Sequence, residues 1–281
     1  MKSYCIKTNH KEIINYLLDK IEKINFDNIY YCNKEFKIYE NVILHYVGED
    51  VEGFIKFVSE LLSNTIIEFY EEKIMNRIIN TNYFYFDEYE RKRILKNCKE
   101  FSLAEYENKK EKLYLAVEEY VKENKSLVLD GIVNFRVKEY VKILDNVVDT
   151  GVNQYIIEKE YTEFIDLLKI YVEQSEIGVN RLHLIYMNGE SILLDEERNI
   201  IPVSDHIFNA KYLSDITFSS NDYALNTLLS LLPGKLEIHL IDGEDEFIET
   251  LKLIFEDRVY VCSECNICKT YKLLHGVSVL N

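Results

Sequence analysis

Residues 236–262 of this chain read LEIHLIDGEDEFIETLKLIFEDRVYVC and carry its clearest structural signal. The strand pattern at 236–241 ends at the turn pair Asp242-Gly243, and a second strand pattern covers residues 258–262. Between them an apolar helical face is formed by Phe247, Ile248, Leu251, Ile254 and Phe255. A strand, a helix and a strand with short connections make a βαβ unit, which is normally parallel and right-handed. The stretch therefore predicts a small parallel sheet.

Three cysteines follow the second of these strands in a C-x2-C-x2-C pattern, Cys262, Cys265 and Cys268. A two-residue gap permits a tight turn, so the three thiolates can converge on zinc or on an iron–sulfur cluster. Either would need a fourth ligand, and His275 is the nearest in sequence. The fold could instead supply Cys5, Cys32, His183, His206 or His239. The ferredoxin pattern C-x3-C-P is incomplete, because Lys272 stands where its fourth cysteine would be. Spacing leaves zinc, iron–sulfur, redox chemistry and inert thiols open.

Other strands precede this unit in the carboxy-terminal region. Residues 182–187 and 191–194 flank Asn188-Gly189, a strong signal for a β-hairpin. A short helix capped by Asn221 or Asp222 is expected to run to Leu232 and to end at Pro233-Gly234.

The first 48 residues predict a small mixed α/β unit. Residues 3–7 have the pattern of a strand, and apolar residues at helical spacing follow over 13–24. Two further strands are expected over 36–39 and 42–47, around a turn at 40–41.

Residues 49–178 are predicted to be helical, because apolar residues recur there three or four apart. Proline is absent from this region, so Gly131 and Gly151 are the expected joints between helices. The chain as a whole is predicted to be α+β, with a central helical bundle at 49–178 between α/β units at 1–48 and 179–281. The carboxy-terminal unit contains the hairpin and the βαβ unit, and the two flanking units either stand separately or share one sheet.

Charge narrows the classes of partner. The 281 residues include 49 Asp and Glu against 33 Lys and Arg, a net charge of −16, which disfavours nucleic acid and anionic membranes. One basic segment, from Arg91 to Lys112, is an exception that could bind nucleic acid. Interleaved glutamates also fit a solvated helix face there, and we regard this second interpretation as the stronger.

The same sequence predicts a cytoplasmic protein. It has no apolar stretch long enough to span a membrane and no secretory signal at its start, and three of its six cysteines are scattered singly. Walker, G-x-G-x-x-G, G-x-S-x-G and H-E-x-x-H motifs are absent from the sequence, so no catalytic residue is proposed, and whether the protein is an enzyme stays open.

Two segments carry a family resemblance: LDGIVNFRVKEY at 129–140 and IEKEYTEFIDLL at 157–168. They resemble the YtxC-like family of sporulation proteins of endospore-forming Firmicutes, and the Ile-, Asn- and Lys-rich composition fits a clostridial member. The resemblance is best from about residue 113 to residue 268. It implies a bacterial cytoplasmic protein linked to sporulation, but no activity and no catalytic residues.

Together these observations predict an accessory or regulatory protein with a thiolate metal site and a protein partner. Arg136 is the candidate partner-binding residue, since a planar guanidinium suits pairing with a carboxylate or phosphate. The alternatives are a redox or metal-dependent enzyme that uses the cysteine cluster and a nucleic-acid-binding module that uses the basic segment.

Overall fold

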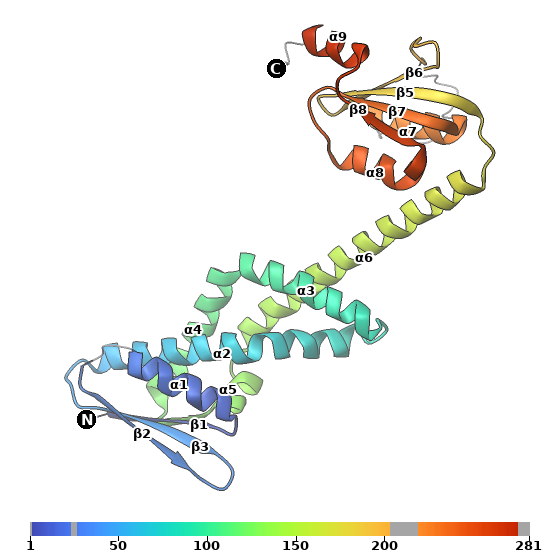
Figure 1. The fold of residues 1–281 in the computed structure, drawn as a ribbon. Coiled ribbons are helices and arrows are strands. Elements are labelled where there is room, and N and C mark those ends of the chain that lie inside the picture. The colour runs from blue at the N-terminus through green and yellow to red at the C-terminus, as the bar shows by residue number, and fades with distance from the viewer. Residues whose placement is uncertain (1, 24–26, 203–218, 275–281) are drawn as a thin grey trace, which may run out of the picture. The chain divides into compact units, whose positions relative to one another are not determined.

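The structure, a computed structural model, describes residues 2–23, 27–202 and 219–274 (Figure 1). The chain is α+β, with a helical centre flanked in sequence by two small sheets, which confirms the predicted fold class. It divides into two compact units, residues 1–158 and residues 159–281.

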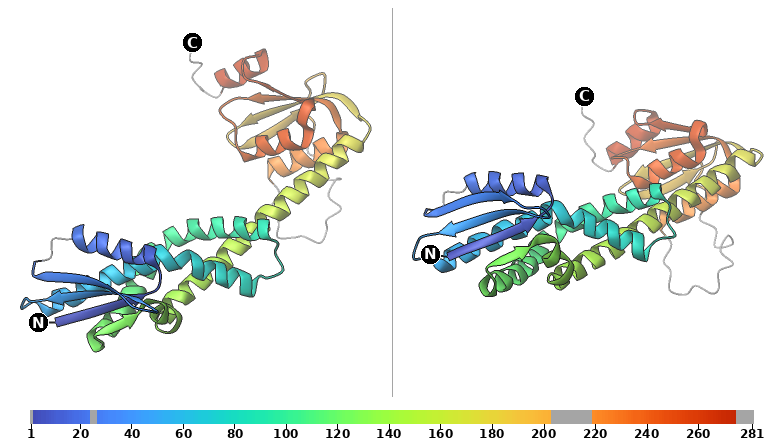
Figure 2. Two further views of the ribbon diagram at one scale, coloured as in Figure 1. Left: turned by 60° about the horizontal axis from the view of Figure 1, so that its bottom comes forward. Right: turned by 90° about the horizontal axis from the view of Figure 1, so that it is seen from below.

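The first unit combines one sheet with several helices. Its elements are β1 (Lys2–Thr8), α1 (Lys11–Lys23), β2 (Ile29–Glu35), β3 (Glu40–Tyr46), α2 (Val51–Asn82), α3 (Glu88–Ala104), α4 (Tyr106–Glu123), β4 (Ser126–Val128), α5 (Leu129–Phe135) and the first part of α6 (Lys138–Gln174). The strand order is β2-β3-β1-β4, with β1 antiparallel to β3 and parallel to β4. Alternate residues of β1, Tyr4 and Ile6, are buried against apolar residues of α1 and α2, which lie on one face of the sheet (Figure 2).

Three sequence predictions for this sheet were wrong. The turn expected at residues 40–41 is the beginning of β3. Residues 36–39, expected as a strand, are the turn between β2 and β3, where the amide of Phe36 donates to the carbonyl of Tyr39. The strand lies earlier, at Ile29–Glu35, where most residues are exposed at a sheet edge and no alternation of apolar residues marks it. β4 lies inside the region predicted to be helical, because a three-residue strand is too short to show a period.

Gly151 and Gly131 do not join helices. Gly151 lies inside α6, and Gly131 lies inside α5. A Cβ atom built on Gly151 would stand 2.6 Å from the Sγ of Cys98 and 3.1 Å from its backbone nitrogen. Glycine is therefore required at position 151 by the close approach of α3 to α6, and not by a turn.

A polar group is buried between the helices of the first unit. The Nζ of Lys109 lies 2.6 Å from Oε1 of Glu71, and the side chain of Lys109 is only 2% exposed. The hydroxyl of Ser102 donates to the same carboxylate oxygen, and the hydroxyl of Tyr140 donates to Oε2. Every polar atom of this carboxylate is thus paired, as burial of a charge requires.

The second unit contains the remaining part of α6 and a second sheet. Its further elements are β5 (Val179–Met187), β6 (Glu190–Leu194), α7 (Ser220–Leu231), β7 (Pro233–Leu240), α8 (Glu246–Phe255), a 3-10 turn (Glu256–Arg258), β8 (Val259–Cys262) and α9 (Asn266–Leu274). The strand order is β6-β5-β7-β8, so the alternative of one sheet shared by both flanking regions is wrong. The predicted hairpin turns at Asn188 and Gly189, both at positive φ, and β7 and β8 are parallel, as the βαβ pattern predicts.

Helix α7 begins two or three residues earlier than expected. Its N-cap is Ser219, and Asp222 closes a capping box from the third helical position instead of capping the helix itself. A serine followed three residues later by an acid is the pattern of such a box.

The two faces of the second sheet have different coverings. α7 and α8 lie on one face and α9 on the other (Figure 1). The first face holds the larger apolar core, which includes Leu184, Leu236 and Ile238. The second face holds a small apolar cluster in which Cys268 of α9 packs against Ile185 and Ile241. The cysteine motif therefore lies against the sheet on the face that α9 covers.

Candidate metal centre

The three cysteines of the motif come together at the carboxyl ends of β7 and β8. Cys262 is the last residue of β8, Cys265 lies in the turn that follows, and Cys268 is in the first turn of α9. The Sγ atoms of Cys265 and Cys268 are 3.6 Å apart, and those of Cys268 and Cys262 are 4.0 Å apart. The sulfurs thus face a common centre, as their spacing predicts.

The fourth group at this centre is His239 of β7. Its Nδ1 lies 3.3 Å from the Sγ of Cys265 and 3.6 Å from the Sγ of Cys268. The four candidate ligand atoms lie within 4.8 Å of one another. His239 and Cys262 are direct partners in the parallel pairing of β7 and β8, so both side chains project from the same face of the sheet. The register of the sheet therefore supplies two of the four ligands.

The spacing fits one tetrahedral ion. With metal–sulfur bonds of about 2.3 Å and metal–nitrogen bonds of about 2.1 Å, tetrahedral angles put sulfurs roughly 3.8 Å from each other and roughly 3.6 Å from the nitrogen. The observed sulfur–sulfur distances of 3.6 and 4.0 Å bracket the first value, and the observed sulfur–nitrogen distances of 3.3 and 3.6 Å lie at or slightly below the second. In a four-iron cluster each thiolate binds a different iron, which holds the sulfurs farther apart. The geometry therefore fits a single zinc-like ion better than a four-iron cluster.

The electrostatics of the thiols also favour a cation. Burial, followed by the neighbouring Cys265, raises the pKa of Cys268 to about 12. At Cys262 burial acts in the same direction, but hydrogen bonds from the backbone amides of Glu264 and Cys265 and from the thiols of Cys265 and Cys268 together outweigh it and lower the pKa. The pKa values of the two thiols are thus shifted in opposite directions. A bound cation would stabilise both thiolates at once.

Behind His239 stand two further polar residues, His183 of β5 and Glu237 of β7. The Nε2 of His239 lies 3.1 Å from the Nδ1 of His183, which in turn lies 3.3 Å from Oε2 of Glu237. Both histidines are almost fully buried, and burial lowers the pKa of each, so both are neutral near pH 7. Neutral imidazole is the form that binds metal.

An open hollow of about 320 Å³ leads to these groups. Its lining includes Arg198, Glu237, His239 and Cys265. Since Cys262 and Cys265 are only partly buried, an ion has a path from solvent to the sulfurs.

Sequence reasoning placed the three cysteines at the site and named His239 only among several alternatives. His275, the favoured fourth ligand, and His206 lie outside the described residues. His183, another alternative, lies next to His239, but it does not belong to the group of four residues whose ligand atoms converge. The signal that would have selected His239 is its position on β7 opposite Cys262, which requires the strand register.

Arg136, the candidate partner-binding residue, is exposed at the end of α5. Its guanidinium lies over the ring of Tyr120 at 5.7 Å, and the neighbouring Phe135 is 71% exposed. The structure thus places a cation and an aromatic side chain together on the surface. Partner binding there stays a prediction.

The basic segment forms parts of α3 and α4, where carboxylates compensate many of its charges. Ion pairs join Lys92 to Glu88, Arg93 to Glu158, Lys99 to Glu72 and Lys109 to Glu71. These contacts favour the interpretation of a solvated helix face, and nucleic-acid binding stays a prediction.

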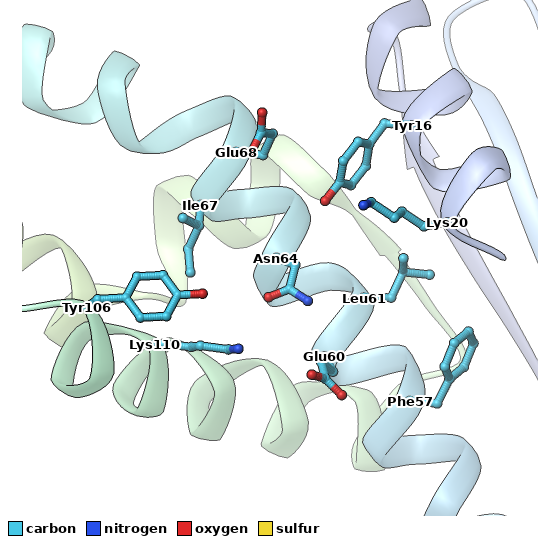
Figure 3. A pocket seen from close by; sticks show the side chains of 10 residues that line it. All are labelled: Tyr16, Lys20, Phe57, Glu60, Leu61, Asn64, Ile67, Glu68, Tyr106 and Lys110. Atoms are coloured by element: carbon cyan, nitrogen blue, oxygen red, sulfur yellow. The ribbon is translucent and has the colours of Figure 1, made fainter. Parts of the chain in front are cut away.

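A groove of about 800 Å³ lies on α2 in the first unit. Tyr16 and Lys20 of α1 face Tyr106 and Lys110 of α4 across Asn64 (Figure 3). Paired amine and ring groups line both of its sides, with Lys20 over Tyr16 and Lys110 over Tyr106. Of the residues that the sequence analysis singled out, Tyr106 and Lys110 of the basic segment belong to its lining, and the cysteines and Arg136 do not.

Across the described parts of the chain, no helix combines the length and the apolar character needed to cross a bilayer.

The fold and the site define an α+β protein with a Cys3His group on one sheet. The model of the YtxC-like family matches residues 56–260, well over half of the chain, and the chain belongs to this family. It is 20% identical over 215 residues to the uncharacterized protein YtxC of Bacillus subtilis (strain 168), covering 73% of this chain and 75% of the relative. No solved structure matches it. The family match includes His239 and ends before Cys262. The assignment of the three cysteines to the site therefore depends on the geometry alone.

Proposed function

We propose that this protein is a cytoplasmic accessory or regulatory protein of sporulation whose second unit is stabilised by one zinc ion. The ion is held by His239, Cys262, Cys265 and Cys268. The convergence of these four ligand atoms within 4.8 Å is the observation that carries the proposal. The link to sporulation rests on the resemblance to the YtxC-like family.

A structural role for the ion follows from the ligand count. Structural zinc sites are closed by four protein ligands, whereas catalytic sites keep a position for water or substrate. Here three cysteines and one histidine fill a tetrahedron. The ion would tie α9 to the ends of β7 and β8, where Cys268 supplies the fully buried contact of the helix. The closed ligand set favours an accessory protein over a metal-dependent enzyme.

A cytoplasmic location agrees with the state of the cysteines. All six are free thiols in the structure, and only three of them belong to the site. A reducing compartment keeps such thiols available for metal.

Metal analysis after purification without oxygen tests the site. We expect about one zinc per chain, no visible colour, and intense thiolate-to-cobalt absorption after exchange with Co²⁺. Cys265→Ser should lose most of the metal, because it removes the sulfur nearest to His239. Cys32→Ser is the matched control, since this exposed cysteine of β2 lies outside the site and should leave the metal content unchanged. Wild-type protein that binds neither zinc nor cobalt would refute the proposal.

The accessory role is tested in the host. Deleting the gene should lower the yield of heat-resistant spores, and a gene copy carrying Cys32→Ser should restore it. A copy carrying Cys265→Ser should restore it less well if the ion supports the function. An unchanged spore yield after deletion would remove the link to sporulation and leave the metal site to be judged by the chemical analysis.

A further inference from the structure

The ring of His239 is engaged through both nitrogens. Its Nδ1 faces the sulfurs of Cys265 and Cys268, while its Nε2 lies 3.1 Å from the Nδ1 of His183. The planes of the two imidazole rings differ by 22°. A hydrogen bond roughly in the plane of both rings joins them. The histidine that would bind the ion is thus held from the opposite side.

Binding of the ion fixes where the proton of His239 must lie. An ion on Nδ1 takes that lone pair, so a neutral His239 carries its proton on Nε2. The Nδ1 of His183 is then the acceptor, and His183 keeps its own proton on Nε2. Both residues are only 2–3% exposed, so water cannot easily take the place of His183 as acceptor. Without this acceptor, the buried N–H group of His239 would lose a hydrogen bond, which costs free energy.

Glu237 is oriented toward this pair. Its Oε2 lies 3.3 Å from the Nδ1 of His183, while Oε1 receives Lys235 at 2.6 Å and Arg181 at 3.7 Å. Lys235 and Arg181 thus hold this carboxylate beside the imidazole pair. A negative charge next to the proton that His239 shares with His183 stabilises this hydrogen bond, and the hydrogen bond holds the ring of His239 in its orientation.

The same three side chains are close enough to hold a cation of their own. Two cations already occupy the carboxylate, however, and their charges repel a third. The group is therefore better suited to support a ligand than to bind a second ion.

We propose that His183 and Glu237 are positioning residues that fix the tautomer and orientation of His239 and so set the affinity of the Cys3His site for zinc. The inference rests on the proposed zinc site and extends it to residues outside the ligand set.

Two substitutions of similar shape at position 183 separate hydrogen bonding from packing. In His183→Asn the side-chain oxygen takes the place of Nδ1 on the same carbon and can still accept from His239. In His183→Leu a methyl group stands there and the acceptor is lost. We expect His183→Leu to weaken zinc binding about 10- to 100-fold, measured by competition with a chromophoric chelator, and His183→Asn to stay within a few-fold of wild type. Glu237→Gln keeps the shape of the side chain and removes its charge. Its loss of zinc affinity should therefore lie between the losses of His183→Asn and His183→Leu.

A spectroscopic readout reports the proton directly. In the Co²⁺ form, the Nε2 proton of His239 should give a strongly shifted, exchangeable proton NMR signal. In wild type and in His183→Asn this proton should exchange slowly with solvent, and in His183→Leu much faster, because only the first two proteins supply an acceptor for it.

The outcomes separate the two proposals. Wild-type protein without thiolate-to-cobalt absorption refutes the zinc site itself. Wild-type protein that binds the ion, with His183→Leu equal to wild type or with Leu and Asn equally impaired, refutes only the positioning role. Circular dichroism of the metal-free variants checks that each variant is folded. If a variant at position 183 does not fold, Glu237→Gln provides an independent test.

Discussion

The buried ion pair of the first unit permits the most quantitative prediction. Replacing Lys109 with Met keeps most of the aliphatic length of the side chain and removes its charge. Glu71, whose side chain is 13% exposed, would then keep only hydroxyl donors, from Ser102 of α3 and Tyr140 of α6. The change therefore isolates the contribution of the cation.

The size of the effect follows from this environment. Breaking one partner of a buried pair costs about 3–5 kcal/mol, because an uncompensated charge is left behind. The two remaining hydrogen bonds to the carboxylate place the expected loss at the lower end, about 3 kcal/mol. For a unit of this size, about 2–4 °C per kcal/mol corresponds to a fall in Tm of roughly 6–12 °C.

Differential scanning calorimetry of the full chain can follow the transition of the first unit. The matched control is Lys99→Met, whose partner Glu72 neighbours Glu71 in sequence but forms a pair that is about half exposed. We expect the control to lose less than about 1 kcal/mol. Equal losses in Lys109→Met and Lys99→Met would refute the reasoning. Adding Glu71→Gln to Lys109→Met should recover part of the loss, since it removes the unpaired charge.

Three further predictions concern Gly151 and Cys98, at the contact between α3 and α6. Gly151→Ala should lower the free energy of unfolding by about 1–3 kcal/mol, because the new methyl group overlaps the Sγ of Cys98. The control Gly131→Ala, whose new methyl group has no neighbour closer than 3.8 Å, should be neutral or stabilising. Equal denaturant midpoints for the two variants would contradict this prediction. Burial raises the pKa of Cys98 from 9.0 to about 12, so folded Cys98 should react with iodoacetamide at pH 8 about a thousandfold more slowly than an ordinary thiol, while exposed Cys32 reacts freely. The unfolded chain loses the Cys98 proton near pH 9 and the folded chain only near pH 12, so this residue contributes stability below pH 9 that falls as the pH rises through that window. Peptide mapping of alkylated protein and alkaline denaturation curves check both statements, and rapid labelling of Cys98 in folded protein would contradict them.

The second sheet was largely predictable from sequence, and the first was not. In residues 236–262 the apolar period, the Asp242-Gly243 turn and the strand at 258–262 all favour one βαβ arrangement, which the parallel pairing of β7 and β8 confirms. In the first sheet the edge strand β2 is mostly exposed and lacks an apolar alternation, so the pattern pointed to the hairpin turn instead. Local sequence signals fail where a strand is defined by its neighbour rather than by its own burial.

The site shows the same division. The C-x2-C-x2-C spacing was sufficient to bring three sulfurs together, because those residues are local in sequence. His239 is 23 positions before Cys262, and only the register between two strands makes it a neighbour. The supporting pair His183 and Glu237 likewise depends on the pairing of β5 with β7. Gly151 illustrates a different limit of prediction from sequence. Glycine serves both at turns and where two helices approach closely, so the residue type alone does not distinguish the two roles.

The division of the ligands between sheet and loop has a kinetic consequence. Strand pairing holds His239 and Cys262 in place before any ion arrives, and only the six residues after Cys262 must close to bring in the remaining thiolates. Closing so short a loop costs little chain entropy, and it leaves the strands paired. Capture and release of zinc would therefore involve local opening near α9, on a timescale much shorter than that of global unfolding, and the protein could exchange its ion with cellular carriers while it stays folded.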